Sequence, residues 1–160
     1  MREALMAHAR DVLTRYPDPN SAMLPLLYLV QEADGWVSPA GLEEVASFLG
    51  VAPAVAESVA SFYTLLQKRP VGRYVLQVCT NLSCSLLGAE HLLDHLGRKL
   101  GIGPGETTPD GLFTLQSVEC LAECGQAPVL QVNLDFHSGL TPEKVDALLD
   151  ALRKEAEQDV

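Results

Sequence analysis

The residues best suited to chemistry in this chain are its four cysteines, which occur as two closely spaced pairs. Four residues separate Cys79 from Cys84, and three separate Cys120 from Cys124. Each pair follows a strand-like run, at residues 74–78 and at residues 113–118. Loops at strand ends can bring four thiolates together from distant parts of a chain, and four thiolates are the ligand set of a [2Fe–2S] cluster. The spacing therefore favours a metal site built from two loops.

Other interpretations of the cysteines stay open on spacing alone. Redox dithiols and structural zinc sites commonly use C-x-x-C, although zinc accepts two to four intervening residues. A disulfide framework is typical of small secreted chains, and we expect no secretory signal because the first residues form no apolar run. Four unrelated buried thiols would not explain pairing at strand ends. The spacing also differs from the C-x4-C-x2-C run of plant-type ferredoxins. We therefore favour an iron–sulfur cluster at these cysteines, with a zinc site as the alternative.

Composition excludes two classes of partner. Among 160 residues, 11 Lys and Arg face 21 Asp and Glu, so the net charge of −10 would repel a phosphate backbone. The longest wholly apolar stretch, Ala22 to Val30, has nine residues, whereas a bilayer-spanning helix needs about 20. We expect neither nucleic-acid binding nor direct membrane insertion. The 48% hydrophobic content is enough for a substantial core.

Residues 1–70 contain no cysteine and show a helical pattern. Apolar periodicity predicts four helices, over about residues 5–16, 21–33, 39–49 and 53–66. The third has Ser38 as its N-cap, Pro39 at its first position and Gly50 beyond its end. The second is apolar on nearly every side, so we expect it to be covered all round, in part by a partner. On the fourth we expect one packed face, formed by Val55, Val59, Phe62, Tyr63 and Leu66.

The pattern changes after Pro70 to strand, helix, strands and helix. We expect strands at residues 74–78, 113–118, 129–132 and 135–139, and helices at residues 85–100 and from 142 onward. The first of these helices would bury a stripe of Leu86, Ala89, Leu93, Leu96 and Leu100, and the last would bury Val145, Leu148, Leu149 and Leu152. Only Lys154–Val160 is expected to fray. The fold class is therefore α+β, with a four-helix unit at residues 1–70 and a thioredoxin-like α/β domain at residues 71–160.

The surroundings of the cysteines are consistent with a bound sulfur-ligated group. Cys84 is expected to precede a helix, whose first N–H groups could face sulfur. Gly125 would let the chain turn tightly beside a bulky cofactor, and Pro128 could fix that turn in either peptide isomer. His91 and His95 have the i, i+4 spacing of metal-binding pairs, but they lie opposite the apolar stripe and are expected on a solvated face.

At these residues the chain resembles a known family, the small thioredoxin-like [2Fe–2S] subunit of the NADH-oxidising module of respiratory complex I. The resemblance covers nearly the whole chain. The matching segments are LYLVQEADGW (27–36), VASFYT (59–64), PVGRY (70–74), CTNLSC (79–84), LGAE (87–90), GETTPDG (105–111) and VECLAECGQAP (118–128).

The resemblance implies a ligand set and an electron-transfer role. In that family the four cysteines hold one [2Fe–2S] cluster, which carries over here to Cys79, Cys84, Cys120 and Cys124. The cluster would accept an electron from the FMN of a partner flavoprotein, which also binds NADH. The chain would then be a non-catalytic subunit of NADH:quinone oxidoreductase, with no catalytic residue of its own, and it has no G-x-G-x-x-G after a strand. Residues 1–70 would be a docking domain.

The same resemblance implies a location and leaves alternatives. The subunit would lie peripherally on the cytoplasmic side of a membrane, in contact with the flavoprotein and other peripheral-arm subunits of complex I. The equivalent subunit of an NAD-linked hydrogenase or formate dehydrogenase shares the helical unit and the cysteine pattern. A stand-alone redox or zinc module is a further alternative, although such a module would need only the part after residue 70.

Overall fold

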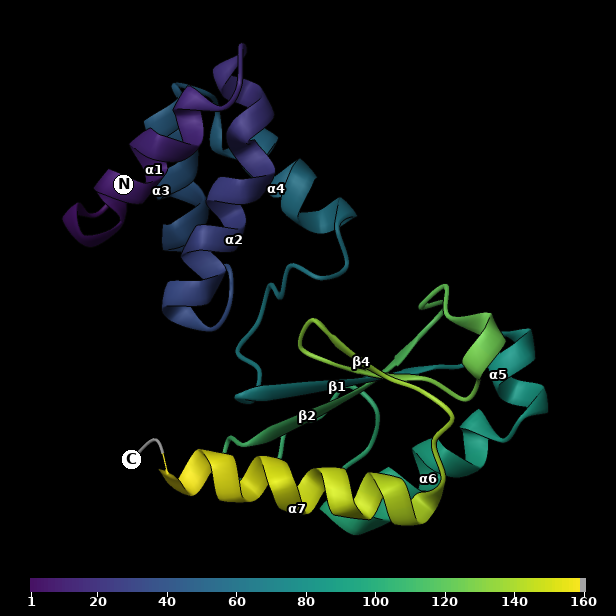
Figure 1. Cartoon of the computed structure of the whole chain (residues 1–160). Helices are drawn as coiled ribbons and strands as arrows, with labels where there is room; N and C mark the ends of the chain where they lie inside the picture. The colour runs from purple at the N-terminus through teal and green to yellow at the C-terminus, as the bar shows by residue number, and fades with distance from the viewer. Residues whose placement is uncertain (159–160) are drawn as a thin grey trace. The chain divides into compact units, whose positions relative to one another are not determined.

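The chain forms two compact units, each with a buried apolar core of its own. The structure is a computed structural model that describes residues 1–158. The units are Met1–Pro70, which we call the helical unit, and Val71–Val160, which we call the sheet unit. Figure 1 shows helices alone in the first and a sheet with helices in the second. The predicted α+β class is therefore confirmed.

One helix forms the centre of the helical unit. The elements are α1 (Glu3–Thr14), the 3-10 turn η1 (Pro19–Ala22), α2 (Met23–Asp34), α3 (Pro39–Leu49) and α4 (Pro53–Phe62). α2 contacts α1, α3 and α4, and it buries Met23, Leu26, Leu27 and Val30. Its apolar surface is thus covered largely by its own three neighbours, which explains the all-round apolar composition.

The ends of α3 follow the capping residues in the sequence. The Ser38 hydroxyl accepts a hydrogen bond from the Gly41 N–H (3.0 Å), and Gly50 ends the helix with φ of 71°. Gly41 also allows close packing, because a Cβ at this position would lie 2.5 Å from Cγ1 of Val30 on α2. A larger residue would push α3 away from α2.

The packed face of α4 differs from the sequence prediction. The helix ends at Phe62, and it buries Ala56 and Ala60. Of the predicted face, Leu66 is buried beyond the end of the helix and Val59 is partly buried, whereas the other three residues are not packed. Phe62 is 77% exposed, and Val55 and Tyr63 are also exposed. Both the large apolar residues and the alanines of α4 recur at helical spacing. The alanines pack, because their small side chains allow α4 to approach α2 and α3 closely. The expectation that Phe62 and Tyr63 serve packing is therefore wrong.

Gln31 holds the chain that follows α4 against the helical unit. Its side-chain nitrogen donates to the carbonyl of Leu65 (3.0 Å), and its side-chain oxygen accepts from the N–H of Gln67 (2.6 Å). The carbonyl of Gln67 in turn accepts from the N–H of Val37 (2.7 Å). One side chain thus satisfies two backbone groups in a turn that would otherwise lack regular pairing.

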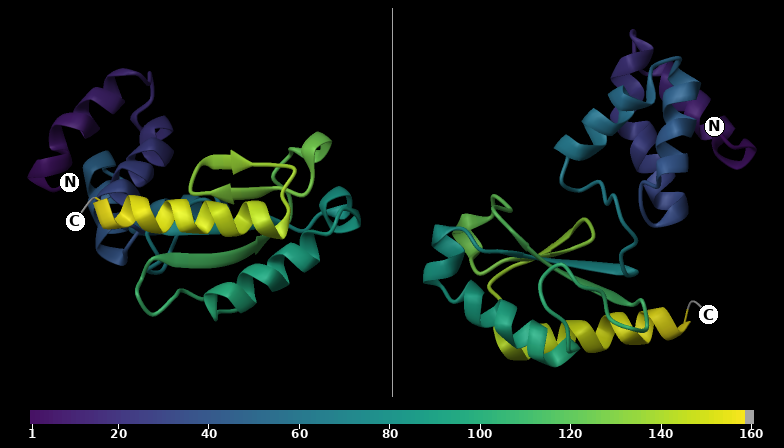
Figure 2. Two further views of the ribbon diagram at one scale, coloured as in Figure 1. Left: turned by 60° about the horizontal axis from the view of Figure 1, so that its bottom comes forward. Right: turned by 180° about the vertical axis from the view of Figure 1, so that it is seen from behind.

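Four strands form the sheet of the second unit. Its elements are β1 (Tyr74–Cys79), α5 (Leu82–Leu86), α6 (Ala89–Leu100), β2 (Phe113–Val118), the 3-10 turn η2 (Cys124–Gln126), β3 (Leu130–Val132), β4 (Asp135–His137) and α7 (Pro142–Gln158). The strand order is β2-β1-β3-β4, with β1 parallel to β2 and the other neighbours antiparallel. Figures 1 and 2 show α6 and α7 side by side against one face of this sheet.

The helix expected after Cys84 is two helices. Gly88, with φ of 95°, separates α5 from α6 and caps the start of α6. α6 buries Ala89, Leu92, Leu96 and Leu100, so Leu92 takes the central place that the sequence assigned to Leu93. Leu86 lies on α5 and is 77% exposed, contrary to the predicted stripe. The left-handed glycine redirects the chain, and the residues before it leave the apolar face of α6.

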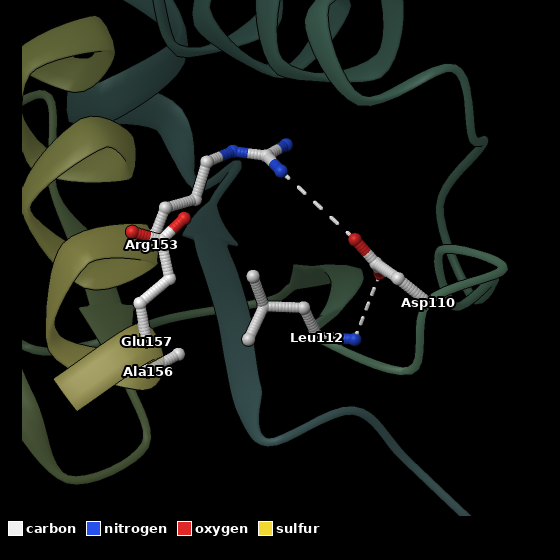
Figure 3. A pocket seen from close by; sticks show the side chains of 5 residues that line it. All are labelled: Asp110, Leu112, Arg153, Ala156 and Glu157. Carbon is white, nitrogen blue, oxygen red and sulfur yellow. Dashed lines mark hydrogen bonds and ion pairs between the residues drawn. The ribbon is translucent and has the colours of Figure 1, made fainter. Parts of the chain in front are cut away.

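α7 closes the sheet unit and buries Val145, Leu149 and Leu152. It continues to Gln158, so fraying from Lys154 onward is not observed, and residues 159 and 160 lie outside the described part. Near its end lies an open hollow lined by Asp110, Leu112, Arg153, Ala156 and Glu157. Figure 3 shows Arg153 reaching toward Asp110, at 3.9 Å, and the Asp110 carboxylate accepting from the Leu112 N–H at 3.0 Å. None of the four cysteines lines this hollow.

Within residues 1–158, no single helix combines the length and the apolar composition needed to cross a bilayer, although α3 and α4 taken together as a bent pair meet those two criteria.

We predict that Gln31→Ala lowers the free energy of unfolding of the helical unit by about 1–3 kcal/mol, because it removes the side-chain partner of two part-buried backbone groups. Urea unfolding followed by circular dichroism would measure the loss. The matched control is Glu32→Ala, at the adjacent exposed position, which should change stability by less than about 0.5 kcal/mol. Equal stability of the two variants would contradict the role of Gln31.

Candidate metal centre

The four cysteines come from four places at one end of the sheet unit. Cys79 is the last residue of β1, and Cys84 lies within α5. Cys120 follows β2 by two residues, and Cys124 begins η2. All four are free thiols. Figures 1 and 2 show α5 beside the segment that carries η2, although the two are far apart in sequence.

Parallel pairing of β1 with β2 brings the two cysteine loops together. Cys79 is the register partner of Val118, so both strands end at the same edge of the sheet. The N–H of Thr80 continues the pairing by donating to the carbonyl of Val118 (3.0 Å). The chain then reaches Cys120 two residues beyond the last paired position. The sequence prediction that each pair follows a strand is confirmed.

Asn81 links the two loops through its side chain. Its amide nitrogen donates to the carbonyl of Glu119 (2.9 Å), and its amide oxygen accepts from the N–H of Leu82 at the start of α5 (2.8 Å). One residue therefore caps the short helix that carries Cys84 and holds the loop that carries Cys120. Sequence reasoning missed this role, although an Asn directly before a helix is a typical N-cap.

The thiols lie close enough to affect one another. The thiols of Cys84 and Cys120 lie close enough to the Cys79 thiol to lower its pKa. The Cys84 thiol lies within range of the charge on Cys124. These pairwise influences connect the first loop with the second, Cys79 with Cys120 and Cys84 with Cys124.

Burial and hydrogen bonding act in opposite directions on the buried pair. Burial is the largest influence on Cys79 and raises its pKa, but N–H groups of Asn81 and Leu121, with the thiols of Cys84 and Cys120, outweigh it and hold the pKa below its usual value. For Cys84, burial and the adjacent Cys79 together raise the pKa. The two thiols therefore influence each other's ionisation, and thiolate is the form that binds metal.

Backbone N–H groups from several segments point at the sulfur atoms. The N–H of Ala122 donates to Sγ of Cys120 (3.3 Å), and Ala122 adopts an unusual φ of 59° in doing so. The N–H of Val129 lies at the Cys84 sulfur. Such donors stabilise negative charge on sulfur, whether the sulfur is a free thiolate or a metal ligand.

The donor set fits an iron–sulfur group in ligand type. It offers four thiols, no competing disulfide and N–H donors to three of the sulfurs. Among residues 1–158, no three His, Cys, Asp or Glu side chains are arranged to hold a single metal ion. His91 is exposed, and His95 lies away from the sulfurs, bonded through Nε2 to Asp146 (2.8 Å).

Three local expectations need correction or completion. Cys84 lies inside α5 rather than before a helix, because Asn81 starts the helix early. Gly125 has no left-handed φ, and a Cβ there would have no atom within 4 Å, so backbone freedom is not the reason for this glycine. The Ala127–Pro128 bond, whose isomer the sequence leaves open, is cis.

Comparison with protein families gives one match over most of the chain. Residues 9–153 match the model of the thioredoxin-like [2Fe–2S] ferredoxins. The resemblance drawn from sequence and the thioredoxin-like character of the sheet unit are thereby confirmed.

Several curated proteins that are similar to this chain are named as subunits of NADH-quinone oxidoreductase. The relative from Mycobacterium tuberculosis is 46% identical over 94% of this chain. The relative from Rhizobium meliloti is 49% identical over 96% of this chain and 89% of its own length. The relative from Thermus thermophilus is 48% identical over 89% of this chain and 81% of its own length. The match covers 60% of the length of the mycobacterial relatives, so this chain spans only part of them.

A solved structure shares the fold at lower identity. The crystal structure of an NAD+-reducing [NiFe]-hydrogenase in the air-oxidised state superimposes with a TM-score of 0.71 at 25% identity. The match covers 84% of this chain and 24% of the hydrogenase chain.

We predict that Asn81→Ala lowers the free energy of unfolding of the cluster-free chain by about 1–2 kcal/mol, because the helix cap and the link to the second loop are both lost. Urea unfolding under reducing conditions would measure the change. Asn81→Asp is the matched variant, since it keeps the cap acceptor and loses only the donor to Glu119, and it should cost less. An Ala variant as stable as the unmodified chain would contradict the double role.

Proposed function

The chain belongs to the family of thioredoxin-like [2Fe–2S] ferredoxins, and from that premise we propose that it is the electron-transfer subunit of an NADH:quinone oxidoreductase. The observation that carries the proposal is the meeting of four free thiols, from two loops, at one end of a parallel strand pair. Identity of 46–49% to proteins named as subunits of such an enzyme, over most of this chain, supports the assignment.

In the proposed site the four cysteines are the ligands, and backbone groups support them. Cys79, Cys84, Cys120 and Cys124 hold one [2Fe–2S] cluster, which when bound supplies one-electron redox chemistry. Backbone N–H groups of Asn81, Leu121, Ala122 and Val129 stabilise negative charge on the ligand sulfurs. The buried positions of Cys79 and Cys84 keep water from one side of the site.

The proposed redox partner is a flavoprotein that binds NADH and FMN. The chain itself acts as a non-catalytic subunit that receives an electron, and the substrate chemistry belongs to the assembly. Its place is peripheral, on the cytoplasmic side of the membrane that carries the quinone-reducing part. The helical unit serves docking, which is supported by Phe62 and Tyr63 at the end of α4, whose exposed rings contact each other edge to face with centroids 5.2 Å apart, since contiguous exposed apolar side chains mark interaction surfaces.

A second candidate is the equivalent subunit of an NAD-linked hydrogenase, and the fold match to an NAD+-reducing [NiFe]-hydrogenase supports it. The identity of 25% to that chain is well below the 46–49% to the quinone oxidoreductase subunits, so the first candidate is preferred. A neighbouring gene for a hydrogenase large subunit, in place of genes for a membrane arm, would reverse the preference.

We predict that anaerobically purified protein contains iron and acid-labile sulfide in near-equal amounts and gives an EPR signal on reduction. Serine at Cys79, Cys84, Cys120 or Cys124 should abolish or strongly destabilise the cluster, because serine is a harder ligand for iron than thiolate. Metal analysis, visible absorption and EPR measure both effects.

The matched control is Ser83→Ala, which lies between the two ligands of the first loop and removes no sulfur. This variant should keep the iron content and the spectrum of the unmodified protein. Stoichiometric zinc without visible absorption in the anaerobic preparation would exclude the [2Fe–2S] assignment.

We predict that a chain starting at Val71 still assembles the cluster, because the core of the sheet unit lies entirely within residues 74–156. The same chain should lose affinity for the flavoprotein, because it lacks the proposed docking unit. Co-purification with the flavoprotein and iron analysis of the truncated chain test this. In the full chain, Phe62→Ala should weaken binding more than Leu134→Ala, a matched change at an exposed apolar residue of the β3–β4 turn. Undiminished co-purification of the truncated chain would refute the docking role.

A further inference from the structure

The two cysteine pairs differ sharply in their access to solvent. Cys79 is 2% exposed and Cys84 is 1% exposed, whereas Cys120 and Cys124 are both exposed. The division follows the two loops, so each loop contributes ligands of one kind. The two pairs of thiols are therefore not equivalent in their access to solvent.

The buried pair is held by regular secondary structure. Cys79 is the last residue of the central strand β1, where it is the register partner of Val118, and its N–H donates to the carbonyl of Val129 (3.1 Å). Cys84 lies on α5, which is capped by Asn81. Moving either thiol outward would break pairing in the sheet or unwind a helix, so this half of the site is shaped by the fold itself.

The exposed pair lies on a loop that is anchored at both sides. On one side Asn81 holds the carbonyl of Glu119 (2.9 Å), and on the other the Gln126 carbonyl accepts from the N–H of Gly139 (2.6 Å). Within the loop, the Gln126 side chain donates to the Glu123 carboxylate (2.9 Å). Cys120 and Cys124 lie between these anchors and face solvent.

We propose that Cys120 and Cys124 are the entry side of this site: they bind an incoming [2Fe–2S] cluster first, and Cys79 and Cys84 complete its ligation second. The inference rests on the proposed function, because it assumes that all four thiols become cluster ligands. The donor is defined by its chemistry as a thiolate-ligated [2Fe–2S] complex, whether of a small thiol or of another protein.

Each ligand exchange balances without any redox change. A cysteine of this chain forms one S–Fe bond as one S–Fe bond to a donor thiolate breaks, and the proton of the incoming thiol passes to the outgoing thiolate. No electron is gained or lost, and no further reactant is needed. A bulky donor can undergo this exchange only with sulfurs that it can touch, and Cys120 and Cys124 are the two cysteines whose residues are exposed.

Access can be measured separately from thiol reactivity with two reagents of the same chemistry. The full cluster-free chain, kept reduced, is treated with N-ethylmaleimide or with a polyethylene glycol maleimide, and labelling at each cysteine is followed by peptide mass spectrometry. The ratio of the two rates at one cysteine cancels its thiolate fraction, because both reagents attack the same sulfur, and it reports steric access alone.

At Cys120 and Cys124 the rate ratio should match that of a free cysteine peptide. At Cys79 and Cys84 the large reagent should be disfavoured by at least about tenfold, because these thiols react only after local opening. Equal ratios at all four positions, or greater access at Cys79 and Cys84, would overturn the inference.

A second measurement follows uptake of the cluster from a [2Fe–2S] complex of glutathione by visible absorption. Cys124→Ser should take up the cluster initially about tenfold or more slowly than Cys84→Ser, whereas Cys84→Ser should lose the bound iron more rapidly to a chelator. Equal initial rates for the two variants would overturn the order of ligation. If the unmodified chain takes up no cluster at all, the proposed function fails; uptake with no difference between the pairs defeats the entry order alone.

Discussion

The parallel pairing of β1 with β2 is the constraint on which the site depends. It places the carboxyl ends of two strands, far apart in sequence, at one edge of the sheet, with Cys79 in register with Val118. A shift of one residue would turn every side chain of β1 to the opposite face and would separate Cys79 from the second loop. Beyond the paired region, the Asn81 side chain donates a hydrogen bond to the carbonyl of Glu119 and so holds the second loop against the first.

The strength of that constraint comes from burial on both faces of β1. All six of its residues are buried, and Leu76 and Val78 pack with Phe113 and Leu115 in the core beneath α6 and α7. On the other face, Gln77 donates through its side chain to Gln116 of β2 (2.9 Å), a cross-strand pair that fits only this register. Apolar packing on one face and a directional hydrogen bond on the other therefore select the same alignment, and with it the position of Cys79.

Two departures from the sequence prediction arise because a helical period alone does not say which side chains of a segment pack. On α4 the large residues and the alanines both recur at helical spacing, and close approach to α2 selects Ala56 and Ala60. On α6 the left-handed Gly88 resets the phase, so that Leu86 is exposed and Leu92 is buried.

The sequence by itself determined the α+β class, the order of the strands and of the helices apart from the break at Gly88, the caps of α3 and the position of each cysteine pair after a strand, because periodicity, capping residues and spacing are local properties. Only the tertiary structure decided which thiols are buried, which N–H groups point at sulfur, and that Asn81 joins the loops. Those features depend on contacts between segments as distant as Asn81 and Glu119. Local preference cannot specify such contacts, because they exist only once the sheet has brought the segments together.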